Sequence, residues 1–206
     1  MSECLHTSPI VIMARHGQTA NAGHNWGLLE VPLSTAGIAT AEQMRLRLLP
    51  YCAVRIYCSP QQRAKDTATI ISGRNIPVEI DSRLSAKDYG IYNGETKQVV
   101  RNIRGPHLSD EDLWRWTPPG GESYITVGRR ILSFLRALID LPPGVVIAVT
   151  HEGLLKVFSS LIAQDQGHIR LGYDYGHTII ASITNSALTS SEAFLDALFE
   201  RSTPST

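Results

Sequence analysis

The sequence predicts an α/β fold with a mostly parallel central sheet that is covered by helices on both faces. Short apolar runs rich in β-branched residues alternate along the chain with longer segments of helical periodicity. This alternation is typical of parallel strands joined by crossover helices. The 206 residues, 43% of them hydrophobic, are enough for one sizeable core, and no linker or internal repeat divides them. We therefore expect a single domain over residues 1–206.

Each expected element follows from its local pattern. Strands are expected at residues 9–14, 54–59, 77–80, 144–150 and 178–185, and helices at 34–49, 60–72, 122–141, 151–163 and 191–200. Ser34 or Thr35 suits the cap of the first helix, whose inner face is expected to carry Ile38, Ala41, Met44 and Leu48. Residues 85–121 are rich in Gly and Pro without strong periodicity, so an irregular functional or mobile segment is expected there, and a flexible tail at 202–206.

Composition argues against several classes of protein. The 19 basic and 19 acidic residues balance, which gives no support to nucleic-acid or anionic-membrane binding. No run of 18 apolar residues predicts a membrane span, and the N-terminus lacks the pattern of a signal peptide. Three cysteines without a CxxC pair do not predict a disulfide framework. A cytoplasmic protein is expected.

Polar residues follow three of the expected strands. Arg15 and His16 come directly after the first strand, Arg63 lies in the first turn of the helix after residues 54–59, and His151 follows residues 144–150. Because ligands of such sheets bind at the carboxyl ends of the strands, we expect these four side chains to meet. Either histidine alone would suggest a satisfied or exposed residue, but the set of four indicates a site.

The residue types in this set suit phosphoryl transfer. Two arginines stay charged at physiological pH and can hold the oxygens of a phosphoryl group. A neutral histidine can attack phosphorus, and a second, cationic histidine can stabilise the charge on the oxygens. The chemistry needs no metal and no other cofactor. A zinc protease is not predicted because the motif at 151 is HEGLL, and no GxSxG elbow, P-loop or dinucleotide fingerprint is present.

Five segments, in order, resemble motifs of the histidine phosphatase superfamily, which is also called phosphoglycerate mutase-like. They are ARHGQTAN (14–21), PLSTAGIATA (32–41), CSPQQRAKDTA (58–68), GGES (120–123) and VTHEG (149–153). The resemblance implies that His16 is the phosphorylated nucleophile and that Arg15, Arg63, His151 and Asn21 complete the phosphate pocket. It places Tyr89 and Lys97 where mutase members contact substrate. Thr19 and Ser59 are expected to shape turns.

One position departs from the family pattern. The general acid of the family is a glutamate four residues before the glycine of ExxYG, and this chain has Ala86 there. A methyl group cannot donate a proton, and general acid catalysis contributes roughly 10²–10⁴-fold. One explanation is that Glu152 replaces it; Asp88, Glu95 and Glu122 are expected to be solvated or structural. Alternatively, the substrate has a good leaving group, or Ala86 was introduced to trap a ligand.

The predicted function is hydrolysis of a small phosphate monoester through a phosphohistidine. Two alternatives stay open: a phosphate-ligand-binding protein disabled by Ala86, and a mutase, which the lack of a long insertion disfavours. Trp114 and Trp116 are expected to pack on the domain rather than stack on a ligand. The apolar terminal helix, with Phe194, Leu195, Leu198 and Phe199, can pack internally or against a second copy, so a homodimer is also open.

Overall fold

The computed structural model describes residues 8–20 and 23–200, and its centre is a five-stranded sheet. The strands are β1 (Ile10–Arg15), β2 (Arg55–Cys58), β3 (Val78–Ile80), β4 (Val145–Thr150) and β5 (Thr178–Ser182). Their order is β3-β2-β4-β1-β5, and all neighbours are parallel except the β1–β5 pair. The prediction of a mostly parallel sheet is confirmed, with β5 as its one antiparallel edge.

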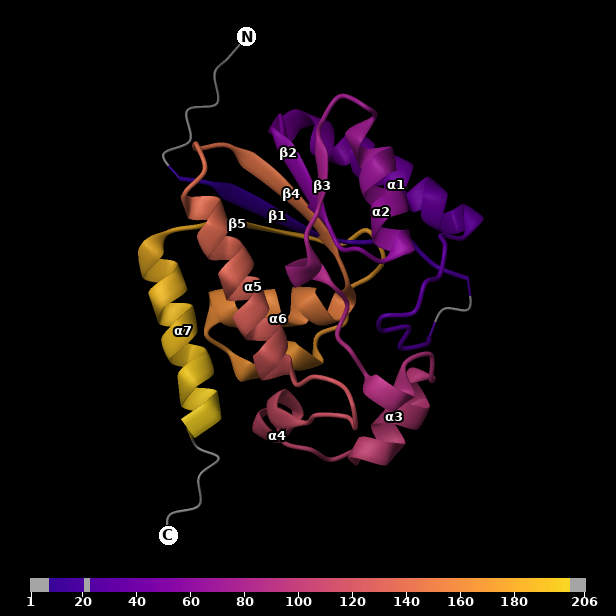
Figure 1. The fold of residues 1–206 in the computed structure, drawn as a ribbon, viewed down its shortest axis with the longest axis vertical. Helices are drawn as coiled ribbons and strands as arrows, with labels where there is room; N and C mark the ends of the chain where they lie inside the picture. Colours follow the sequence, from indigo (N-terminus) through magenta and orange to yellow (C-terminus); the bar gives the residue numbers. More distant parts are fainter. Residues whose placement is uncertain (1–7, 21–22, 201–206) are drawn as a thin grey trace.

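Helices cover both faces of the sheet (Figure 1). One face carries α1 (Thr35–Leu48) and α2 (Gln62–Ser72), and the other carries α5 (Tyr124–Ile139), α6 (Glu152–Ala163) and α7 (Asn185–Glu200). Two short helices, α3 (Lys97–Arg104) and α4 (Asp110–Arg115), lie apart from the sheet at the bottom of the view in Figure 1. Short 3₁₀ turns occupy Leu49–Tyr51, Ser82–Leu84, Gly90–Tyr92 and Gln166–Arg170, the last being η4.

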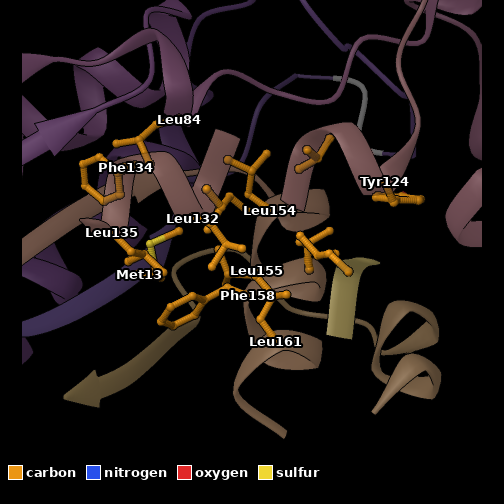
Figure 2. Packing of buried hydrophobic residues seen from close by; sticks show 14 of the residues in the cluster. Met13, Leu84, Tyr124, Leu132, Phe134, Leu135, Leu154, Leu155, Phe158 and Leu161 are labelled. Atoms are coloured by element: carbon orange, nitrogen blue, oxygen red, sulfur yellow. The ribbon is translucent and has the colours of Figure 1, made fainter. Parts of the chain in front are cut away.

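The core consists of two clusters separated by the sheet. Alternate residues of β1 point to opposite faces, so Val11 and Met13 join the cluster under α5, α6 and α7, while Ile12 and Ala14 join the cluster under α1 and α2. Figure 2 shows the larger cluster, which includes Met13, Phe134 and Phe158. Every residue of β4 is buried, as expected for the central strand of a sheet covered on both sides.

Several sequence predictions need correction. Residues 85–121 are not irregular throughout, because Thr96 and Ser109 accept the N-terminal N–H groups of α3 and α4 and cap them. Ile38 is 49% exposed, since the buried face of α1 is centred on Gly37, Ala41, Met44 and Leu48. The helix α7 begins at Asn185 rather than residue 191, and Thr184 Oγ1 accepts the Ala187 N–H at its start.

The terminal helix packs internally. Leu195 and Leu198 of α7 are buried in the cluster that includes α5, and Phe194 packs against it, whereas Phe199 is 55% exposed. Among the helices within the described residues, none combines the length and apolar character needed to cross a membrane.

Candidate active site

A cavity of about 370 Å³ opens at the carboxyl ends of the strands, a size that suits a small-molecule ligand. Backbone hydrogen bonds at the ends of the strands position the residues that line this cavity. The N–H of His16, directly after β1, donates to Thr150 O of β4 at 2.9 Å, and the N–H of Ser59, directly after β2, donates to Val149 O at 3.0 Å. Because β4 lies between β1 and β2, three segments far apart in the sequence end side by side.

The ring of His16 is held with one nitrogen free. Its Nδ1 lies 2.6 Å from Gly17 O, and a carbonyl oxygen only accepts, so Nδ1 carries the proton and Nε2 keeps its lone pair. Burial lowers the pKa of His16 well below its ordinary value, and the nearby Arg63 and Arg15 cations lower it further, although the Gly17 contact acts the other way. His16 is therefore neutral at pH 7 and can act as a nucleophile.

The second histidine is oriented by a chain of hydrogen bonds. The N–H of Ala86 donates to Gln61 Oε1 at 3.1 Å, and the Ser59 hydroxyl donates to the same oxygen at 2.5 Å. Ser59 Oγ must then accept from His151 Nε2, which lies 2.7 Å away. The proton of neutral His151 is thus on Nε2, and Nδ1 is bare. The ring of His151 lies 5.0 Å from that of His16, centroid to centroid.

Burial lowers the pKa of His151 well below its ordinary value, and the charge of Arg63 adds to this effect. Two buried polar side-chain atoms within the described residues have no hydrogen-bond partner: Nδ1 of His151 and Nε of Arg15. Buried polar atoms are rarely left unpaired in folded proteins. Since both atoms belong to residues that line this cavity, they are available to hydrogen-bond a ligand there.

Two arginines supply positive charge beside the histidines. Arg63 is 2% exposed and donates to Leu29 O and Gly27 O, both at 2.8 Å, which fixes its guanidinium; burial lowers its pKa to about 10. Arg15 donates to Tyr173 O, and its guanidinium carbon lies 3.9 Å from the centre of the Tyr175 ring. Arg63 therefore stays cationic at neutral pH, and both guanidinium groups have little freedom to move.

Glu152 is the carboxylate of the cavity and is surrounded by cations. Its oxygens lie 2.6 Å from Lys97 Nζ, 3.2 Å from Lys156 Nζ and 3.3 Å from Arg15 Nη1. Burial raises the pKa of the Glu152 carboxyl, but Lys156, Arg15 and Lys97 outweigh it and hold the pKa below its ordinary value. Glu152 is ionised at neutral pH, and an ionised carboxylate has no proton to donate.

Ala86 lies on the cavity wall, where its methyl group offers no acid. Two of the other acidic candidates have structural partners: Asp88 accepts from Gly90 N and Asn93 Nδ2, and Glu122 pairs with Arg130. Next to Ala86, burial lowers the pKa of Lys87 to about 8, and its Nζ donates to Glu122 O.

The cavity brings together the predicted residues that the structure describes. These are Arg15, His16, Arg63, Tyr89, Lys97, His151 and Glu152. Asn21 lies outside the described residues. Trp114 is fully buried in the core, as expected, whereas Trp116 lines the cavity. No group of three or more His, Cys, Asp or Glu side chains within the described ranges is placed to hold a metal ion.

Sequence patterns did not identify four further residues of the site. Ser59 and Gln61 orient His151, although we expected Ser59 only to shape a turn. Tyr175 stacks on Arg15, and Arg104 lines the cavity from α3. Gln61 lies inside the CSPQQRAKDTA segment, so its position was a usable signal. Tyr175 and Arg104 follow no motif, and only the path of the chain brings them to the cavity.

Comparisons with known proteins agree with this geometry. A curated relative, the glucosyl-3-phosphoglycerate phosphatase of Mycolicibacterium vanbaalenii, is 33% identical over 171 residues, which are 74% of this chain and 73% of the relative. The metal-independent phosphoserine phosphatase of Arabidopsis thaliana is 28% identical over 167 residues, 75% of this chain and 68% of the relative.

Among solved structures, a mycobacterial glucosyl-3-phosphoglycerate phosphatase in complex with VO3 superposes with a TM-score of 0.75 at 28% identity, covering 84% of this chain and 92% of that one. The family model described as histidine phosphatase superfamily (branch 1) matches residues 11–191. The chain belongs to the histidine phosphatase superfamily, branch 1.

Proposed function

We propose that this protein hydrolyses a small phosphate monoester through a phosphohistidine formed on Nε2 of His16. Membership of the histidine phosphatase superfamily supports the reaction class. The observation that carries the proposal is the pair of unpartnered atoms, His151 Nδ1 and Arg15 Nε, in the same cavity as the free Nε2 of a neutral His16. Donors and acceptors left unpaired around a nucleophile suit the oxygens of a phosphoryl group.

In the first step, the lone pair of His16 Nε2 attacks phosphorus. The P–N bond forms while the ester P–O bond breaks, and the leaving oxygen keeps the bonding electrons. Arg15 and Arg63 offset charge on the phosphoryl oxygens. Nδ1 of neutral His151 accepts a hydrogen bond from a protonated phosphoryl oxygen. When the ring is protonated, Nδ1 donates a hydrogen bond instead, and the negative charge of a bound phosphate favours this protonation.

In the second step, water attacks phosphorus, the P–N bond breaks, and its electrons return to His16. Phosphate leaves and one proton of the water is released. A carboxylic acid at position 86 would protonate the leaving oxygen in the first step, and the carboxylate left behind would accept the water proton in the second. With Ala86 at this position and Glu152 held ionised by three cations, the first step depends on a good leaving group and the second step is slow.

The experiment is rapid-mixing kinetics with p-nitrophenyl phosphate, whose phenolate leaves readily. We expect a burst of p-nitrophenol equal to the enzyme concentration, followed by slow turnover, and a phosphoryl label on His16 that acid removes. An alkyl phosphate such as glycerol 3-phosphate should react slower by a large factor. His16→Ala should abolish the burst and lower turnover by at least about 10³-fold.

The matched control is His107→Ala, because His107 is an exposed histidine that does not line the cavity. Full turnover by His16→Ala would overturn the proposal. Phosphate-ester binding without any turnover or labelling would instead identify a non-catalytic binding protein. Equal rates on the aryl and alkyl phosphates would contradict the missing-acid argument.

The relatives guide the choice of natural substrate. The most similar curated relatives include glucosyl-3-phosphoglycerate phosphatases, so glucosyl-3-phosphoglycerate is the first compound that we propose to assay. A second compound is phosphoserine, after the plant relative.

A further inference from the structure

The cavity has a second group of cations away from the histidines, on the helix α3. Lys97, Arg101 and Arg104 are spaced at i, i+4 and i+7, so they share one face of this helix, and all three line the cavity. Across from them, Lys156 of α6 and Arg170 of η4 also line it. The phosphoryl site at His16 does not account for this row, because Arg15 and Arg63 already serve that site.

The anions of the protein balance only part of this charge. Glu152 is the one acidic residue among the described residues that line the cavity, and it pairs with Lys97, Lys156 and Arg15. Arg170 pairs with Asp110. Within the described part of the chain, the guanidinium groups of Arg101 and Arg104 make no hydrogen bond or ion pair.

Arg104 is half-buried, which makes its lack of a partner unfavourable. Burial lowers the pKa of Arg104, and the neighbouring Arg170 and Arg101 cations lower it further, while Tyr124 and Tyr89 act in the opposite direction. All of these side chains line the same cavity. The two phenol hydroxyls hydrogen-bond to each other at 3.4 Å, which leaves one of their two protons for an anion.

The helix dipole explains only part of the placement of Arg101 and Arg104. Cations in the last turn of a helix interact favourably with its dipole, and Arg101 and Arg104 both lie in the last turn of α3. Cationic side chains that point to solvent would interact with the dipole equally well. The dipole does not explain why both arginines line the cavity, or why like charges are placed one turn apart, which destabilises a helix.

We propose that Arg101 and Arg104 bind a second anionic group, a carboxylate or a phosphate, on the leaving-group part of the substrate. This inference rests on the proposed phosphatase function and specifies its substrate class: phosphate monoesters of acids, or bisphosphates. A planar guanidinium matches either anion through two parallel hydrogen bonds. The anion would supply the charge that Arg101 and Arg104 lack in the protein.

The test compares two inhibitors that differ only in the second anion. Both 3-phosphoglycerate and glycerol 3-phosphate are assayed as competitive inhibitors of p-nitrophenyl phosphate hydrolysis, and glycerol 1,3-bisphosphate distinguishes a phosphate from a carboxylate. Because inhibition is measured, neither compound needs to be turned over. We expect at least one compound that carries a second anionic group to bind at least about tenfold tighter than glycerol 3-phosphate.

For each variant, the readout is the inhibition constant of glycerol 3-phosphate divided by that of the compound with a second anionic group. Arg104→Gln and the double variant with Arg101→Gln should bring the ratio close to one. Arg74→Gln removes an exposed arginine that does not line the cavity and should keep the ratio. Thermal melting confirms that each variant is folded.

Two outcomes overturn the inference: no preference for a second anion in the unmodified protein, or a preference that the double variant retains. In both cases the proposed function stands as long as His16 is phosphorylated. If p-nitrophenyl phosphate is not hydrolysed and His16 takes no label, the proposed function fails, and calorimetric binding of the same compounds then decides the inference separately.

Discussion

At the scale of single residues, the chemistry of the cavity depends on which side-chain atoms carry protons. The free Nε2 of His16 and the bare Nδ1 of His151 both follow from contacts with acceptors or donors of fixed character. The carbonyl of Gly17 fixes the first ring, and the chain from Ala86 N–H through Gln61 and Ser59 fixes the second. The methyl group of Ala86 offers no proton to a leaving group, and Glu152 is ionised.

Restoring a carboxyl group at position 86 tests this account. Ala86→Glu should raise the rate on an alkyl phosphate by about 10²–10⁴-fold, because general acid catalysis is worth about that much. The rate on p-nitrophenyl phosphate in the burst phase should change little. Steady-state and burst kinetics on both substrates measure the two effects.

The control for that variant is Ala86→Gln, which has nearly the same volume as Glu but no acidic proton. If Gln accelerated the alkyl phosphate as much as Glu, the gain would come from shape rather than from proton transfer. No gain from Glu would place the acid position of the family elsewhere in this chain.

At the scale of elements, two glycines set the position of the His16 segment against α1. A Cβ on Gly17 would lie 2.4 Å from Gly37 O, and a Cβ on Gly37 would lie 2.0 Å from Gln18 O. The same contact includes the helix cap, since Ser34 Oγ donates to Gln18 O at 3.1 Å and accepts the Gly37 N–H. The start of α1 therefore holds the loop that carries the nucleophile.

Gly37→Ala should destabilise the protein and weaken catalysis together. The added methyl meets backbone atoms that cannot rotate away, so we expect a loss of about 1–3 kcal/mol in the free energy of unfolding and a lower burst rate. Gly172→Ala is the matched control, because a Cβ at Gly172 has no atom within 4 Å. Chemical denaturation and burst kinetics measure both effects, and a fully active, equally stable Gly37→Ala variant would contradict this role of α1.

At the scale of the whole molecule, the sheet brings residues that are far apart in the sequence next to each other. Arg15 is in register with Thr150 across the β1–β4 pair, so residues 16 and 151, 135 positions apart, follow adjacent strand ends. The histidines lie beneath the protein surface as a result. Their burial next to Arg63 lowers the pKa of both, and this has a consequence for stability.

Stability should fall as the pH is lowered from about 7.5 to 5.5. In the unfolded chain both histidines have a pKa of about 6.5 and take up protons in this window, whereas in the folded chain they stay neutral. The unfolded state then binds more protons, so the free energy of unfolding decreases by about 3 kcal/mol. Urea denaturation at three pH values measures it.

Replacing both buried histidines by glutamine should flatten this dependence, while His107→Ala should leave it unchanged. The carboxyls with lowered pKa, Glu152 and Asp81, act at a lower pH and do not contribute in this window. A pH dependence that persists in the double variant would show that other groups cause it.

The sequence by itself determined the strands, the helix cap at Ser34, and the meeting of Arg15, His16, Arg63 and His151 at the cavity, because each depends on a local pattern or a short motif. Only the tertiary structure decided the ionised state of Glu152, the contact of Ser59 with His151, and the position of Arg104 on the cavity wall. These properties depend on the distances between charges and polar atoms of segments far apart in the chain. Local pattern does not contain those distances, since packing sets them.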